Sequence, residues 1–230
     1  MKLGDKPGIM LKSPVSDYVV FDLETTGLSP ASDQIIELSA VKVKGGRVTE
    51  EFSALVNPGI AIPYRASMIN NITDQMVEDE PDISRVLPLF LDFIGDSVLV
   101  GHNIKGFDLK LLYRDCQKLF KALPENDYID TLILSRVCYP AARYRSLKFF
   151  AEYFQIPYIG AHRALNDCRV NQIVYEKFAG MVRSGQTGQS IEGEKICPRC
   201  GRALVRRKGR FGSFWGCTGF PECRYTENIR

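Results

Sequence analysis

The sequence contains no apolar stretch long enough to cross a membrane. Its most apolar segment, residues 86–100, is interrupted by Pro88, Asp92 and Asp96, whereas a spanning helix needs about 20 apolar residues. The first residues lack an apolar core of the length found in signal peptides. Internal repeats are also absent. We therefore expect a cytoplasmic protein with no membrane partner.

Histidine is scarce, and its two occurrences mark two short acidic runs. These runs are HNIKGFD, residues 102–108, and HRALND, residues 162–167. A third run, FDLETTG at residues 21–27, follows apolar, β-prone residues. Side chains alternate between the two faces of a strand. Asp22 and Glu24 are therefore expected on one face at the end of a buried strand.

Taken in their order along the chain, the three runs resemble the exonuclease motifs of the DnaQ-like DEDDh family, over residues 17–180. The resemblance implies 3′→5′ hydrolysis of phosphodiester bonds with release of 5′-mononucleotides. It implies that Asp22 bridges two metal ions. Glu24 and Asp167 would hold the ion that binds the attacking water, and Asp108 would serve the second ion. His162 resembles the general base that takes a proton from this water.

The chemistry of four converging carboxylates agrees with a metal site. Two like charges about 5 Å apart repel by about 3 kcal/mol at an effective dielectric constant near 20, so the group needs cations. Hard oxygen ligands suit Mg²⁺ or Mn²⁺ rather than zinc. Two such ions about 3.5–4 Å apart can hold both the attacking and the leaving oxygen of a phosphodiester. We therefore expect two Mg²⁺ or Mn²⁺ ions as catalytic cofactors.

The spacing of His162 and Asp167 has a geometric consequence. On one continuous helix, side chains five residues apart point about 140° apart and could not serve one site. We expect His162 on a loop that leads into a helix and Asp167 in the first turns of that helix. Our hypothesis is that His162 docks at the site only when substrate is present.

The hydrophobic pattern predicts a mixed β-sheet flanked by helices, in agreement with the ribonuclease H-like α/β fold that the family resemblance implies. Strands are expected near residues 18–24, 34–44, 47–56, 98–100 and 128–130, with Gly45-Gly46 as a two-residue hairpin loop. Helices are expected over residues 82–94, 107–120, 146–154 and 163–181. Pro88 should kink or split the first of these helices.

Several residues beside the motifs have both a functional and a structural interpretation. The resemblance implies contacts with the terminal nucleotide for Thr25, Thr26 and Leu28, and turn formation is the alternative for the two threonines. His102, Asn103 and Phe107 are further candidates for substrate contact. Their structural alternatives are a hydrogen bond at a strand end for His102, ordering of the loop for Asn103 and core packing for Phe107. Asp130 resembles a recurrent acid of the family and equally fits the cap of a helix at Thr131. Asn71 stands where relatives commonly have glycine, and asparagine tolerates the left-handed conformation.

The last part of the chain differs in charge from the rest. The net charge is +3, but the segment from Lys195 onward holds nine Lys or Arg and two acids, which leaves −4 for the remainder. A basic tail on an acidic body indicates a module that binds polyanions.

Four of the seven cysteines, Cys197, Cys200, Cys217 and Cys223, lie in this tail. Their spacing favours one tetrahedral structural Zn²⁺ over disulfides. The other three, Cys116, Cys138 and Cys168, are expected to be reduced thiols. Because modules below about 40 residues rarely fold without a metal or crosslinks, zinc should supply most of the folding free energy.

Cations and aromatic rings alternate between the cysteine pairs, as expected for binding single strands. The segment resembles the C-terminal zinc ribbons of type IA topoisomerases, which implies binding of single-stranded DNA. The alternative is that the rings form the small core of the ribbon. The candidate residues are Arg206, Arg207, Lys208, Arg210, Phe211, Phe214 and Trp215.

The sequence thus predicts four parts: an N-terminal extension (residues 1–16), an exonuclease domain (17–182), a flexible linker (183–194) and a zinc ribbon (195–230). The expected substrate is the 3′ end of single-stranded DNA. One alternative is RNA trimming. A second is a proofreading subunit whose ribbon docks a protein, within a DNA polymerase or repair complex.

Overall fold

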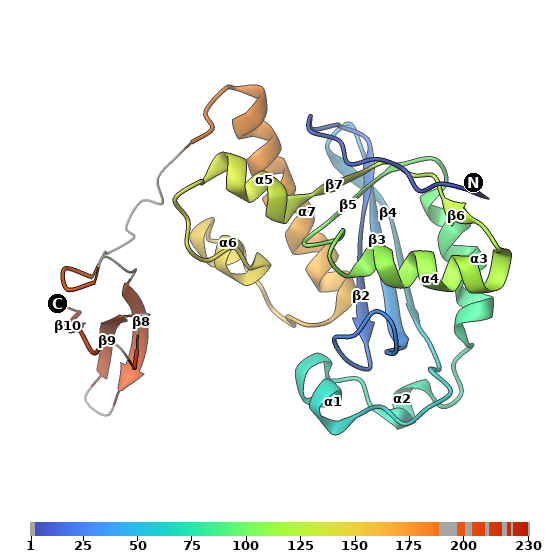
Figure 1. The fold of residues 1–230 in the computed structure, drawn as a ribbon, viewed down its shortest axis with the longest axis horizontal. Coiled ribbons are helices and arrows are strands. Elements are labelled where there is room, and N and C mark those ends of the chain that lie inside the picture. The colour runs from blue at the N-terminus through green and yellow to red at the C-terminus, as the bar shows by residue number, and fades with distance from the viewer. Residues whose placement is uncertain are drawn as a thin grey trace.

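A five-stranded mixed sheet lies at the centre of the larger part of the molecule (Figure 1). The computed structural model describes residues 3–188, 197–200, 204–209, 212–217, 220–221 and 223–229. The strand order is β4-β3-β2-β5-β7. The strands are β2 (Tyr18–Thr25), β3 (Ile35–Lys44), β4 (Arg47–Leu55), β5 (Val98–Gly101) and β7 (Tyr128–Asp130).

Strands β2, β3 and β4 are antiparallel neighbours, and β5 and β7 continue the sheet in parallel with β2. Lys44 pairs with Arg47, so Gly45-Gly46 forms the predicted two-residue hairpin loop. Both glycines have positive φ angles, 56° and 74°. These angles fit the turn geometry that matches the twist of the flanking strands.

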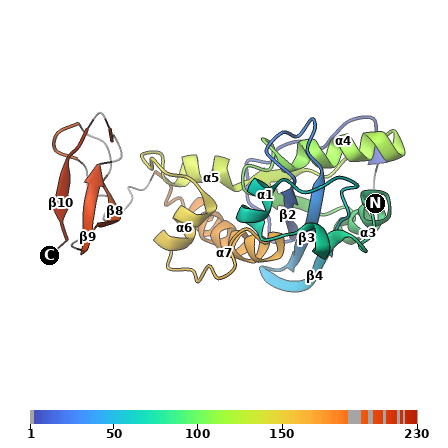
Figure 2. The same cartoon turned by 90° about the horizontal axis from the view of Figure 1, so that it is seen from below.

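Helices cover both faces of the sheet, which confirms the predicted α/β architecture. One apolar core joins Tyr18 and Val20 to α5 (Thr131–Cys138), α6 (Leu147–Tyr153) and α7 (Ala164–Arg183). The other joins the alternate β2 residues Val19, Phe21 and Leu23 to α3 (Ile83–Ile94) and α4 (Asp108–Phe120). Figure 2 shows α4 and α7 on opposite sides of the sheet. The strand period of two thus decides which face each β2 side chain joins.

Two short helices at the end of β2 were not predicted. They are α1 (Tyr64–Asn70) and α2 (Asp74–Val77), and they enclose a small apolar cluster with Ile36 of β3. Asn71 ends α1 with a φ of 58°, so it adopts the left-handed conformation that asparagine tolerates better than most residues.

Helix α3 runs from Ile83 to Ile94 with Pro88 inside it, so of the predicted kink or split, the split does not occur. Asp82 caps this helix by accepting a hydrogen bond from the Ser84 amide, 2.8 Å. Val86, Leu87, Phe90, Leu91 and Ile94 are buried in the sheet core. This packing holds the helix together although proline removes one backbone hydrogen bond.

The N-terminal segment lies along the outer strand β7. The Leu11 amide donates to the Tyr128 carbonyl (2.8 Å), and the Tyr128 amide donates to the Ile9 carbonyl (2.9 Å). Further along, β1 (Leu3–Gly4) pairs with β6 (Leu123–Pro124). The segment therefore covers a sheet edge whose backbone groups would otherwise be open to other chains.

The tail forms a separate three-stranded antiparallel sheet in the order β10-β9-β8. Its strands are β8 (Leu204–Gly209), β9 (Gly212–Cys217) and β10 (Thr226–Asn228). Of the predicted linker, residues 189–194 lie outside the described residues. Among the described helices, none has the length and apolar content needed to span a bilayer.

Candidate active site and metal centres

Asp22 and Glu24 continue the face of β2 that carries Tyr18 and Val20, which packs against α7. Both acids are partly buried at the end of the strand. Their carboxylates meet that of Asp167, and one oxygen from each of the three lies within 4.8 Å of the others. Residues about 140 positions apart in the sequence thus form a compact group of oxygen ligands.

Asp167 lies in the first turn of α7. Its Oδ1 accepts a hydrogen bond from the His162 amide, 3.2 Å, and its carboxylate also accepts one from the Tyr158 hydroxyl. Cys168 is fully buried behind the carboxylates, with its Sγ 3.4 Å from the Ser39 carbonyl. The helix and the preceding loop therefore fix the orientation of Asp167 from several directions.

Asp108 is the first residue of α4 and is 5% exposed. Its carboxylate accepts a hydrogen bond from the Leu23 amide, between the two acids of β2. It is not one of the three carboxylates within 4.8 Å. It is still close enough to Asp22 for its charge to raise the Asp22 pKa.

The protonation of the group reflects burial and mutual repulsion. Burial, followed by the charges of Asp108 and Asp167, raises the pKa of Asp22 well above its usual value. Burial and the charge of Asp167 raise the pKa of Glu24 to about 8. Burial raises the pKa of Asp108 to about 7. Four ionised carboxylates in this space need cations, and a group of oxygen ligands fits divalent Mg²⁺ or Mn²⁺.

His162 lies in the loop before α7, as its spacing from Asp167 predicted. Its side chain is exposed, and its φ of 64° is left-handed. Its backbone amide donates to Asp167 Oδ1. Burial raises the pKa of Asp167, and the nearby His162 side chain opposes part of this rise. An exposed histidine beside the site agrees with the hypothesis of docking on substrate.

The two threonines at the end of β2 form hydrogen bonds that shape the following loop. Thr25 Oγ1 donates to the Gly27 carbonyl (2.6 Å), and Thr26 Oγ1 donates to Asp33 Oδ1 (3.1 Å). Both residues are buried, whereas Leu28 is 88% exposed. Of the three predicted nucleotide contacts, Leu28 is therefore the one whose side chain is open to a ligand.

The second motif shows a similar division. His102 Nδ1 lies 3.0 Å from Thr131 Oγ1, and burial lowers the His102 pKa. Asp130 caps α5 through the Leu132 amide (2.9 Å), as one of the two interpretations predicted.

Phe107 precedes α4 and packs, partly buried, against the core. Asn103 is exposed with a φ of 61°, and its amide donates to Asp130 Oδ1 (3.0 Å). Asn103 is thus the more accessible of the candidate contacts here.

Three residues near the carboxylates were not predicted from the sequence: Glu37, Asn70 and Tyr158. Buried Asn70 donates a hydrogen bond to the Glu24 carboxylate and lies 3.4 Å from the Thr25 carbonyl. Glu37 is 1% exposed and pairs with Arg163. An acid inside the apolar run Ile35–Leu38 was the available signal for Glu37; nothing local marks Asn70 or Tyr158.

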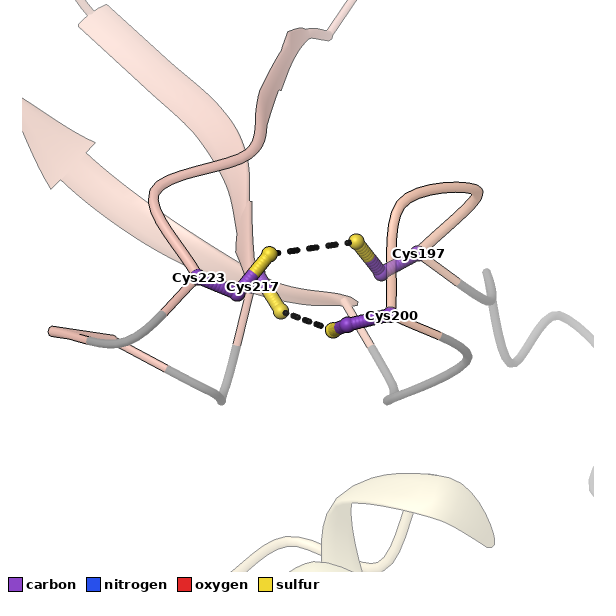
Figure 3. A group of neighbouring side chains, drawn as sticks. All are labelled: Cys197, Cys200, Cys217 and Cys223. Carbon is purple, nitrogen blue, oxygen red and sulfur yellow. Dashed lines mark hydrogen bonds between the residues drawn. The ribbon is translucent and has the colours of Figure 1, made fainter.

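The four tail cysteines converge (Figure 3). The Sγ atoms of Cys197 and Cys223 are 3.7 Å apart, and those of Cys200 and Cys217 are 3.4 Å apart. A tetrahedral zinc with Zn–S bonds of about 2.3 Å would separate its sulfurs by about 3.8 Å. The thiol group therefore fits a zinc ion.

The ribbon residues separate into cationic and packed groups. Arg206, Arg207 and Lys208 on β8 are exposed. Trp215 packs against the cysteine cluster, as the core interpretation predicted, and Phe214 is partly buried. The predicted contacts Arg210 and Phe211 lie outside the described residues.

Comparison with known proteins shows where the two parts have relatives. A family model described as "Exonuclease" matches residues 19–175, and one described as "Topoisomerase DNA binding C4 zinc finger" matches residues 194–230. The DNA polymerase III subunit epsilon of Aquifex aeolicus is 39% identical over 160 residues, which cover 70% of this chain and 79% of that protein.

Two further relatives extend this comparison. A DNA polymerase III PolC-type of Clostridium perfringens is 40% identical over 153 residues, 66% of this chain. The chain matches only 10% of that protein's length. The structure of "Exonuclease X in complex with 5' overhanging duplex DNA" superposes with a TM-score of 0.57 and 28% identity, and covers 76% of this chain and 96% of that one.

Proposed function

Because the chain belongs to the DnaQ-like exonuclease family, we propose that it is a metal-dependent 3′→5′ exonuclease that degrades single-stranded DNA. The single observation that supports this most strongly is the meeting of Asp22, Glu24 and Asp167, with Asp108 close by. The proposed organisation is an exonuclease domain at residues 17–182, a linker at 183–194 and a ribbon at 195–230.

In this proposal, Asp22 would contribute to the binding of both divalent ions, Glu24 and Asp167 would help hold one of them, and Asp108 would help hold the other. When bound, the ions neutralise the carboxylates, activate water and stabilise charge at the scissile phosphate. The orientation of the ligands comes from the protein: Asn70 donates to Glu24, the Leu23 amide to Asp108, and Tyr158 to Asp167.

His162 is the proposed general base. It swings from its exposed loop position to remove a proton from the attacking water. The water oxygen bonds to the terminal phosphorus while the bond from phosphorus to the neighbouring 3′ oxygen breaks. The departing 3′ oxygen takes a proton from solvent water, so the shortened strand keeps a 3′ hydroxyl and a 5′-mononucleotide leaves. The protonated His162 then returns its proton to solvent. Histidine suits proton transfer near neutral pH.

We propose that the ribbon binds single-stranded DNA and that Zn²⁺ folds it. The exposed cations of β8 would contact phosphates, and the partly buried ring of Phe214 on β9 would contact bases. The family model that matches this segment is described as DNA-binding. Tethering a strand to the ribbon raises the local concentration of 3′ ends at the exonuclease domain.

A second candidate is a proofreading subunit of a DNA polymerase. The names of the relatives favour it, since two are DNA polymerase III components. In that case the ribbon would dock a protein surface. Salt dependence separates the two roles, because phosphate binding weakens steeply with added salt.

The test is digestion of matched DNA and RNA oligonucleotides, labelled at either end, with Mg²⁺, Mn²⁺ or chelator. We expect 5′-labelled single-stranded DNA to shorten stepwise from its 3′ end, and only with metal. Release of the 5′ label first, or equal activity in chelator, would contradict the proposal. Faster digestion of RNA would instead favour the RNA-trimming alternative.

A further inference from the structure

A fifth carboxylate, Glu37, lies next to the proposed metal ligands but is engaged differently. Glu37 is on β3 and pairs in register with Glu24 on β2. It is 1% exposed. Its Oε1 accepts from Arg163 Nη2 (2.9 Å), and its Oε2 accepts from Arg163 Nε (3.2 Å) and from the Ala164 amide (3.0 Å). Both oxygens therefore bond to the start of α7, and Glu37 is not one of the carboxylates that lie within 4.8 Å of one another.

These contacts join β3 to the first residues of α7. Arg163 precedes the helix without a side-chain cap of its own, and Ala164 is the first helical residue. The first amides of a helix lack partners within the helix, and its N-terminus favours negative charge. Glu37 therefore caps α7 from another element, while the arginine fork gives the contact a fixed geometry.

The position of this contact matters because the proposed catalytic residues His162 and Asp167 lie on either side of it. His162 directly precedes Arg163, and Asp167 lies in the same first turn as Ala164. Asp22 and Glu24, by contrast, belong to β2, which is bonded to β3 over its whole length. The Glu37–Arg163 pair is thus a direct polar connection between the strand side and the helix side of the site.

We propose that Glu37 and Arg163 are positioning residues, which fix Asp167 and His162 relative to Asp22 and Glu24. The inference rests on the proposed nuclease function for its activity readout. A displacement of about 1 Å in a catalytic group can lower a rate about 100-fold, so a connection this close to the site sets the rate without touching substrate.

The chain contains a matched control. Arg169, farther along α7, pairs with Glu51 of β4 through Nε (2.8 Å) and Nη2 (2.6 Å). This pair also ties α7 to the sheet through a two-pronged arginine, but its side chains are 49% and 35% exposed. Because this pair is more exposed, its loss should loosen helix docking less, so the variants are compared at a temperature where each is fully folded. A positioning role then lowers the activity of folded Glu37→Gln and leaves that of folded Glu51→Gln unchanged.

The experiment compares Glu37→Gln, Arg163→Lys and Glu51→Gln with wild type and Asp22→Asn in the full chain. Glutamine keeps the shape of Glu37, but its amide nitrogen would face a donor; lysine keeps the Arg163 charge but loses the fork. We expect Glu37→Gln to lower kcat about 10–100-fold and Arg163→Lys about 5–10-fold, with KM changed less than about 3-fold. Glu51→Gln should leave both within about 2-fold.

Two readouts do not depend on activity. Hydrogen exchange at the Ala164 amide should accelerate at least about 10-fold in Glu37→Gln and stay unchanged in Glu51→Gln. Calorimetry without DNA should show weaker Mn²⁺ binding in Glu37→Gln than in Glu51→Gln, because Asp167 is less well placed. If Glu37→Gln does not fold, hydrogen exchange and Mn²⁺ binding are compared between Arg163→Lys and Glu51→Gln instead.

The outcomes are distinct. Wild-type kcat and Mn²⁺ affinity in both Glu37→Gln and Arg163→Lys would overturn the inference, as would equal losses in Glu37→Gln and Glu51→Gln. If wild type itself shows no nuclease activity, the proposed function fails. The exchange and Mn²⁺ measurements would then still decide whether Glu37 positions the carboxylates.

Discussion

At the scale of single residues, the carboxylates are held closer together than their charges favour. The pKa of Glu24 is raised to about 8 and that of Asp108 to about 7, in both cases mainly by burial. A raised pKa in the folded state means that the fold favours the protonated acid. Without a metal ion, ionisation of these carboxylates therefore lowers the free energy of unfolding. A bound cation offsets this loss by neutralising their charges.

This predicts a pH dependence of the metal-free protein. The stabilising contribution of the neutral acids is complete below about pH 4 and is lost as pH rises through about 7 to 8. The unfolding free energy in chelator should fall by a few kcal/mol, roughly, between pH 5 and 8. Saturating Mn²⁺ should restore it. Chemical denaturation at several pH values measures this, and a flat profile without metal would contradict it.

His162 is the second test at this scale. His162→Ala should lower kcat about 10²–10⁴-fold, because a general base is lost, while Mn²⁺ binding is retained. His102 offers the contrast, since it is bonded to Thr131 inside the fold. His102→Ala should lower the melting temperature and leave the activity of folded molecules within about 3-fold. Equal kcat losses in both variants would contradict the assignment of His162 as the general base.

The sequence predicted the site residues that lie in recognisable motifs. It did not predict residues that reach the site only because distant segments pack together. Asp22, Glu24, Asp108 and Asp167 were recognisable by their runs. Asn70 and Tyr158 come from α1 and from the loop before α7, and their contacts depend on how these segments pack. No local spacing encodes such contacts.

At the scale of elements, long segments with clear periodicity were predicted well. The β3–β4 hairpin and helices α4 and α7 lie close to their expected bounds. Helix α1, with seven residues, and α2, with four, are too short to show a helical period. Pro88 does not split α3, because burial of one face of the helix stabilises it by more than the one missing hydrogen bond costs.

The ribbon provides an element-scale prediction with its own reporter. Trp215 is the single tryptophan of the chain and packs against the cysteine cluster. Removing Zn²⁺ with a strong chelator, or Cys217→Ser, should unfold the ribbon and shift Trp215 emission to longer wavelength. Metal analysis should give one zinc per chain before treatment. Unchanged emission in a zinc-free sample would contradict a zinc-dependent fold.

At the scale of the whole molecule, we propose that the exonuclease domain hydrolyses the strand and that the ribbon binds it. Deleting residues 190–230 should raise KM on long single strands about 10-fold or more and change kcat less than about 3-fold, because tethering is lost but the active site is kept. Steady-state kinetics at two salt concentrations measure this. A large kcat loss with unchanged KM would contradict it.

The most direct test of the central claim is anomalous diffraction from a crystal soaked in Mn²⁺. We predict two manganese peaks about 3.5–4 Å apart, with Asp22 bound to both and Glu24, Asp108 and Asp167 around them. Carboxylates that remain apart, with no manganese between them at saturating metal, would contradict it.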